Sequence, residues 1–183
     1  MGSRVALGDI CTVSGGKRLP KGTSLTQEKN SHPYIRVRDL SGNKILEVDA
    51  NFEFVDDETQ AEIAKYTVSA GDLVLSIVGT IGLLGKVGST LEGANLTENC
   101  VKLSRFNNVN SDYLYYFLKS NLGQDEIAKR TVGAVQPKLP IRNIRAIELP
   151  LLSLGDQEKI ATILSTIDEK LALNTKLNGY LAA

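Results

Sequence analysis

The sequence has few of the residues from which hydrolytic and metal sites are built. Its 183 residues include one histidine, His32, and two cysteines, Cys11 and Cys100, which lie far apart. One histidine without a Gly-x-Ser-x-Gly motif excludes a catalytic triad, and we interpret His32 as a surface or loop side chain. The isolated cysteines are typical of buried thiols in a reducing compartment rather than of a disulfide or metal site. We therefore expect no catalytic residue and no metal.

Long hydrophobic runs and net charge are also absent. No apolar stretch approaches the ~18 residues that a membrane-spanning helix needs, and no hydrophobic segment follows Arg4 as in a secretory signal. The 42% of apolar residues can still fill a core, which excludes wholesale disorder. We expect a cytoplasmic protein without membrane contact, built as one domain with an appendage or as two small domains.

The charges balance overall but are segregated along the chain. Seven acids and no base lie between Glu47 and Glu62, whereas the segment from Lys129 to Arg145 carries five bases and no acid. Two smaller basic groups lie at residues 17–21 and 36–38. Such segregation favours a local positive face that could bind nucleic acid. A solvated surface of mixed charge is the alternative.

A glycine series at residues 79–88 looks at first like a phosphate-binding loop. Its spacing fits neither Gly-x-Gly-x-x-Gly nor a P-loop, and Val87 stands where the P-loop has a magnesium-binding hydroxyl. We interpret these residues as the glycines of a hairpin. The Asp168–Lys170 pattern resembles a nuclease motif, but it lies on an expected helix without a partner carboxylate.

An alternating pattern at residues 34–38 predicts a half-buried strand. Ile35 and Val37 would face the core, and Arg36 and Arg38 would point outward. Two guanidinium groups on the open face of a strand are suited to contacts with guanine bases.

Other patterns predict the remaining elements of one domain. The continuous apolar run at 73–78 is typical of a central strand, and 100–103 predicts another strand. A helix is expected over 111–122 and a strand near 145–149. Together these elements predict an α+β fold in which a mixed β-sheet with short helices spans residues 4–150.

The C-terminal residues predict a long coiled-coil helix over 153–182. Ser153 and Asp156 fit a capping box, and 4-3-4-3 spacing of one seam predicts a helix about 40 Å long. The expected seam is Ile160, Leu164, Ile167, Leu171, Asn174, Asn178 and Leu181. This seam predicts self-association or a partner helix, and folding back on its own domain is the alternative. The two asparagines would either fix the register or lie in a frayed end.

Several segments, taken in order, resemble the specificity (S) subunit of type I restriction–modification systems. The C-terminal third carries a Gly-x-x-Gln-x-x-Leu element, an Ile-x-Leu-Pro-Leu segment, a Gln-x-x-Ile helix start and an Ile-Asp pair, at residues 133–139, 147–151, 157–160 and 167–168. Earlier segments that agree lie at 5–10, 34–40 and 71–76. No single motif is specific for this family, but the occurrence of all of them in this order is.

The resemblance implies a target recognition domain at 4–150 and a helix at 153–182 that serves dimerisation and methyltransferase docking. Subunits of this family do no chemistry. They read bipartite double-stranded DNA and hold modification (methyltransferase) and restriction (motor-nuclease) subunits, to which S-adenosylmethionine, ATP and Mg²⁺ belong. This chain has one recognition domain and one helix, so we expect a half-subunit that forms a two-fold homodimer. The alternative is a dimeric protein scaffold that binds DNA weakly until the modification subunit joins.

Basic and amide side chains are the expected DNA contacts. We expect arginine to read guanine, Gln136 to pair with adenine, and Lys138 and Arg142 to hold phosphates. Gln136 could instead order its loop, and each of the others could be a solvated side chain or make a structural hydrogen bond. The full set of candidates is Lys17, Arg18, Lys21, Arg36, Arg38, Thr80, Arg130, Gln136, Lys138 and Arg142.

Overall fold

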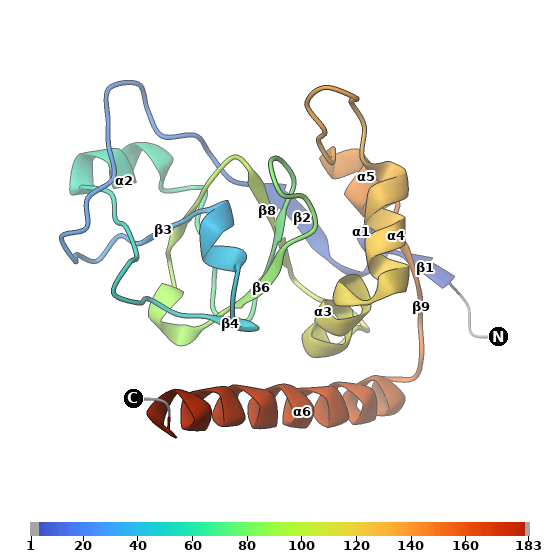
Figure 1. Cartoon of the computed structure of the whole chain (residues 1–183). Coiled ribbons are helices and arrows are strands. Elements are labelled where there is room, and N and C mark those ends of the chain that lie inside the picture. Colours follow the sequence, from blue (N-terminus) through green and yellow to red (C-terminus); the bar gives the residue numbers. More distant parts are fainter. Residues whose placement is uncertain (1–3, 182–183) are drawn as a thin grey trace.

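The computed structural model describes residues 4–181, except for the side chains of residues 176 and 179–181. A five-stranded sheet in the order β2–β8–β5–β6–β4 occupies its centre (Figure 1). All neighbours in this sheet are antiparallel except β4 and β6, which are parallel. The strands are β2 (Thr12–Gly15), β4 (Ile45–Leu46), β5 (Leu73–Ser76), β6 (Leu84–Val87) and β8 (Cys100–Ser104).

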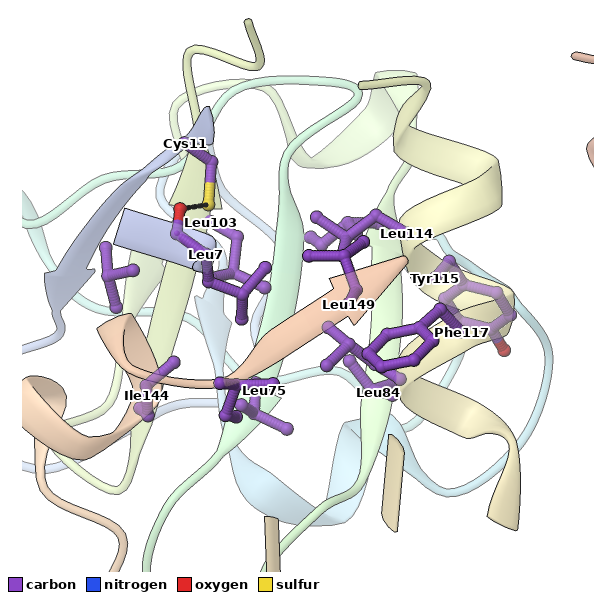
Figure 2. Close-up of a cluster of buried hydrophobic side chains, with 14 of the residues drawn as sticks. Leu7, Cys11, Leu75, Leu84, Leu103, Leu114, Tyr115, Phe117, Ile144 and Leu149 are labelled. Atoms are coloured by element: carbon purple, nitrogen blue, oxygen red, sulfur yellow. Dashed lines mark hydrogen bonds between the residues drawn. The ribbon is translucent and has the colours of Figure 1, made fainter. Parts of the chain in front are cut away.

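Both faces of this sheet are covered, which explains why β5 is buried at every position. Successive side chains of a strand point to opposite faces. Leu73 and Leu75 therefore face one hydrophobic cluster, which Figure 2 shows, while Val74 faces a second cluster. The first cluster lies under the helices, and in it the Cys11 thiol donates a hydrogen bond to the Leu7 carbonyl oxygen at 3.3 Å.

Short helices and a two-stranded sheet cover the first cluster. Strand β1 pairs with β9, and the helix pair α3 and α4 follows β8 along the chain. The expected helix at 111–122 is wrong in detail: Asn110 caps α3, and Ser120 begins a separate helix. The expected strand at 145–149 is shorter, because Pro140 is followed by helix α5. The elements are β1 (Arg4–Ala6), α1 (Leu7–Ile10), α3 (Ser111–Lys119), α4 (Asn121–Arg130), α5 (Ile141–Arg145) and β9 (Glu148–Pro150).

The second cluster lies under irregular chain between residues 34 and 96. Here the expected strand at 34–38 is wrong: only Tyr34 and Ile35 pair, and a 3₁₀ helix follows at once. The backbone amide of Arg36 donates to the Asp39 carboxylate, which stabilises this turn and ends the strand. The elements of this part are β3 (Tyr34–Ile35), η1 (Val37–Leu40), α2 (Asp57–Ile63), η2 (Ser89–Leu91) and β7 (Asn95–Leu96).

A single long helix, α6 (Leu154–Leu181), ends the described chain. The Ser153 hydroxyl accepts a hydrogen bond from the Asp156 amide at 3.2 Å, as the capping box predicts. The expected α+β fold with a long C-terminal helix is confirmed. No helix among residues 4–181 is long and apolar enough to cross a membrane.

Candidate nucleic-acid interface

Four loops from different parts of the chain meet at one end of the strands of the central sheet. We name residues 16–21, 77–82, 96–99 and 131–139 the loop edge. Backbone hydrogen bonds join them: the Lys17 amide to the Leu96 carbonyl at 2.8 Å, the Ile77 amide to the Asn99 carbonyl at 2.8 Å, and the Leu139 amide to the Ile77 carbonyl at 2.9 Å. Figure 1 shows the 131–139 loop at the top of the domain and α6 along its bottom.

The loop at 131–139 is a closed turn whose tip projects from the domain. Val132 and Lys138 pair through two backbone hydrogen bonds of 2.9 Å. Gly133 has φ +96°, and a Cβ there would lie 2.7 Å from the Gln136 carbonyl oxygen, so the turn requires glycine. The Gly-x-x-Gln spacing is therefore a turn that presents the Gln136 side chain.

Side chains at this tip point into solvent. Val135 is 94% exposed, and Gln136 and Lys138 are exposed as well. The Gln136 side chain makes no hydrogen bond within residues 4–181, so it does not brace the loop in this conformation. Sequence reasoning missed Val135, because a lone valine between alanine and glutamine has no pattern that marks it as exposed. An exposed apolar group of this kind can contact a thymine methyl group.

The hairpin between β5 and β6 lies beside this loop. Val78 forms a backbone bridge with Lys138, which places Thr80, exposed at the hairpin tip, near the same surface. The Ser76 hydroxyl donates to the Thr80 carbonyl at 2.6 Å, and Gly79 has φ +77°. The glycines therefore form a hairpin as predicted, and the structure brings together Thr80, Gln136 and Lys138.

The basic residues of the 16–21 loop keep their charges at the surface. Arg18 is paired with Glu98 at 2.7 Å, yet its side chain is 81% exposed. The hydrogen bond and charge of Glu98 raise the pKa of Arg18. Surface pairs of this kind contribute little to stability, so the guanidinium could exchange the carboxylate for a phosphate. Lys17 and Lys21 are also exposed, and the Lys17 ammonium lies 5.6 Å from the centre of the Tyr66 ring.

Arg130 and Arg142 differ in their side-chain contacts. Arg130 donates to the Glu126 carboxylate at 2.6 Å and to the Ala146 carbonyl at 2.7 Å, so it ties α4 to the end of α5. Its side chain is mostly covered. Arg142 is exposed on α5, and no ion pair engages it within the described part of the chain.

The structure places Arg36 and Arg38 away from a strand face. Arg36 lies against the Glu53 carboxylate with its side chain only 24% exposed, and its Nε and Nη2 atoms find no hydrogen-bond partner among the described residues. Arg38 is half exposed and donates to the Asn51 carbonyl at 3.1 Å. The expected outward pair of guanidinium groups on a strand is therefore wrong, because η1 turns the chain after Ile35.

A second basic surface was missed by sequence reasoning. Lys65, Lys102 and Arg105 line a hollow of about 240 Å³ beside β2, and no carboxylate is among its described lining residues. Lys102 alternates with buried Val101 and Leu103 on β8, and that period of two was the available signal. Lys65 comes from the turn after α2, so only the tertiary structure brings it to this hollow.

The two halves of α6 have different surroundings. Ala161 is buried and Ile160 packs against the first hydrophobic cluster, so the start of the helix folds against its own domain. Further along, Ile163, Ile167 and Leu171 are 62%, 48% and 59% exposed. Of the expected seam, Ile160 and Leu164 are half-buried, Ile167, Leu171, Asn174 and Asn178 are exposed, and the side chain of Leu181 lies outside the described residues.

No group of three or more histidine, cysteine or acidic side chains among residues 4–181 is arranged to hold a metal ion. Burial raises the pKa of the Cys11 thiol to about 11 and that of the Cys100 thiol to about 12. Both cysteines are therefore protonated and unreactive near neutral pH.

The chain is similar to known proteins along nearly its whole length. The family model of the type I restriction modification DNA specificity domain matches residues 3–182. The type I restriction enzyme MjaIX specificity subunit of Methanocaldococcus jannaschii is 24% identical over 173 residues, which are 94% of this chain and 39% of that protein.

Solved structures share the fold. A chain from a study of complex assembly and conformational transition in a type I R-M system superposes with a TM-score of 0.74 at 16% identity, covering 98% of this chain and 41% of that one. The type I restriction-modification S subunit of M. genitalium superposes with a TM-score of 0.65 at 19% identity, covering 96% of this chain and 41% of that one. The chain thus spans about two fifths of the length of these relatives.

Proposed function

Because the chain belongs to the family of type I restriction–modification DNA specificity domains, we propose that it reads one half of a bipartite DNA sequence. Members of this family recognise DNA and are not themselves catalysts. In this proposal double-stranded DNA is the ligand, and methyl transfer and cleavage belong to modification and restriction subunits.

The loop edge is the observation that carries the proposal. It presents an exposed amide, a hydroxyl, an apolar side chain and several cations on neighbouring loops of a rigid sheet. Amides and methyl-complementary groups read base edges, whereas lysine and arginine neutralise phosphates. Gln136, Val135 and Thr80 are the proposed base contacts, and Lys17, Lys21, Lys138 and Arg142 the proposed phosphate contacts.

The remaining candidates have weaker support as contacts. Arg18 and Arg38 are exposed enough to reach DNA after they exchange their present partners. Arg36 and Arg130 already serve contacts within the domain, so DNA would have to displace Glu53 or Glu126. We expect these two to support the fold more than they support recognition.

The second half of the site would come from a second copy of this chain. The chain spans about two fifths of its relatives, so two copies would approach the length of one such subunit. The exposed stripe of Ile163, Ile167 and Leu171 lies on a helix of 28 residues, and an antiparallel copy would cover it. Such a helix is about 42 Å long, close to the ~34–36 Å turn that separates half-sites read by dimers.

The same helix pair would hold the modification subunit, which in turn would recruit the restriction subunit. A second candidate function follows from this arrangement, namely a protein scaffold that binds DNA weakly until the modification subunit joins. The zero net charge favours this candidate, because it gives no bulk attraction to DNA.

The deciding experiment is selection of bound sequences from a random double-stranded library with the purified full chain, alongside its mass by light scattering. We expect two chains per particle and enrichment of an interrupted palindrome. Enrichment that appears only when the modification subunit is added would support the scaffold instead. A folded chain that enriches no sequence under either condition would overturn the proposal.

A further inference from the structure

Lys44 links the recognition domain to α6. Its side chain is only 12% exposed, although it precedes an edge strand of the sheet. The ammonium donates to the Asp112 carboxylate at 2.7 Å, to the Ser165 hydroxyl at 2.8 Å and to the Tyr116 hydroxyl at 3.2 Å. An ammonium has three protons, and these partners use all three.

Helix α3 supplies the other half of the link. The Tyr116 hydroxyl donates to the Asp168 carboxylate of α6 at 2.9 Å, and the Tyr116 ring lies 4.5 Å from the Lys44 ammonium. Asp112 also accepts from Lys86 of β6 at 2.8 Å. Burial would raise the pKa of Asp112, but the hydrogen bonds and charges of Lys44 and Lys86 outweigh it and hold the pKa below its ordinary value. We name Lys44, Asp112, Tyr116, Ser165 and Asp168 the helix clamp.

A separate anchor holds the start of α6. The buried Gln157 side chain accepts from the Asn110 amide at 2.8 Å and donates to the Leu152 carbonyl at 2.9 Å. Ser165 and Asp168 lie about 12 Å and 16 Å further along the helix axis. One attachment point lets a rod pivot, whereas two separated points determine its direction. After Asp168, residues 169–175 are exposed, so the clamp is the last polar anchor before the free part of the helix.

The hydrogen bonds of the helix clamp are suited to fixing the angle between α6 and the recognition domain. Apolar side chains tolerate sliding, because dispersion contacts have little directionality. A covered ammonium with three satisfied hydrogen bonds resists such sliding, because any rotation of α6 leaves a desolvated donor without its acceptor. A swing of roughly 10° about the clamp would move the helix end, about 20 Å away, by about 3.5 Å, which is the rise of one base pair.

We propose that the helix clamp determines the spacer length between the two half-sites that the dimer accepts, so that Lys44, Tyr116, Ser165 and Asp168 are positioning residues for spacing. The inference rests on the proposed reading of a bipartite site by two copies of this chain. Recognition of each half-site would remain with the loop edge, at the other end of the domain.

The test applies the random-library selection to the full-length wild type, to Ser165→Ala and to Tyr116→Phe with Ser165→Ala. Neither change touches the loop edge, and alanine favours helix at position 165. The wild type is expected to enrich one spacer length. The double variant is expected to enrich the same half-site with at least two spacer lengths, differing by one base pair. Thr166→Ala is the matched control, since Thr166 is exposed and donates only to the Thr162 carbonyl of its own helix.

The conservative variant Ser165→Thr keeps the hydroxyl and is expected to restore the single spacer length. An unchanged spacer in Ser165→Ala and in the double variant would overturn the inference while the proposed function stands. A wild type that enriches no half-site would instead refute the proposed function, and the inference with it. If the double variant does not fold, the spacer distribution of Ser165→Ala alone decides.

Discussion

The guanidinium of Arg36 pairs with the carboxylate of Glu53 while both side chains are largely withdrawn from water, at 24% and 18% exposure. The Glu53 carbonyl also accepts the amide of Tyr34, so the segment that carries Glu53 runs beside β3. The pair therefore joins the end of β3 to a distant part of the chain and lies beneath the turn that begins η1.

Replacing Arg36 with alanine is expected to destabilise the fold more than it weakens DNA binding. Removal of Arg36 leaves the covered Glu53 carboxylate with only the more distant Arg38 guanidinium, 3.5 Å away, which costs about 1–3 kcal/mol. Arg38→Ala is the comparison variant: Arg38 also lies 3.5 Å from Glu53, but its side chain is half exposed, so its loss should cost less than ~1 kcal/mol. Urea unfolding of both variants measures the difference. Equal stability of the two variants would show that the Arg36 pair is not structural.

Gln136 and Lys138 are expected to affect DNA binding in different ways. Loss of an amide that reads a base should cost about 1–3 kcal/mol and relax the preference at one position of the half-site. Loss of a phosphate contact should weaken all sequences alike and reduce the slope of log affinity against log salt by about 0.9. Titrations of Gln136→Ala and Lys138→Ala at several salt concentrations separate the two. A Gln136 variant that melts early would support a role in ordering the loop.

Changing Ile167 and Leu171 to glutamine is expected to dissociate the dimer without unfolding the domain. Both side chains are about half exposed in one chain, so their replacement removes contacts between copies rather than contacts within the domain. Sedimentation should show a shift toward single chains, with an unchanged melting temperature at low concentration. Changes at Ile160 and Leu164 would be less informative, because these residues also cover the domain. A dimer that persists would place the interface elsewhere.

Asp39 is expected to make the fold less stable as the pH rises from about 4 to about 6. Burial raises the pKa of its carboxyl to about 6, despite the opposing charge of Arg38. A raised pKa means that the folded state holds the proton more tightly. The contribution of the Asp39 carboxyl to the free energy of unfolding is therefore present at low pH and is lost as the pH rises through the folded-state pKa.

The neutral variant Asp39→Asn should escape this loss. Its stability relative to wild type is expected to increase between pH 4 and pH 7 by on the order of 1–3 kcal/mol. Denaturant midpoints across that range measure the change. A difference that does not vary with pH would mean that Asp39 ionises in the folded protein as it does in the unfolded chain.

Local patterns in the sequence predicted the parts of the protein whose causes are local. The largely apolar run at 73–78 predicted a central strand, because a strand covered on both faces lacks the alternation of apolar and polar residues. The capping box and the unbroken apolar spacing predicted α6, and the glycine spacing predicted the hairpin after β5. The predicted strand at 34–38 was wrong because a side-chain contact competes with the alternating pattern. The Asp39 carboxylate accepts the Arg36 amide, and residues 37–40 form a 3₁₀ helix.

Residue patterns were enough to predict the fold class, the long helix, and a set of charged and amide residues as candidates for an interface. Which of these candidates are exposed for a DNA contact depends on how distant segments pack in the folded domain. The tertiary structure placed Val78 beside Lys138, withdrew Arg36 into a pair with Glu53, and joined Lys44 to Ser165 across 121 positions of the chain. The physical reason is that periodicity and turn chemistry act over a few residues. The partner of a charged side chain depends on which distant segments the folded core brings within hydrogen-bonding distance.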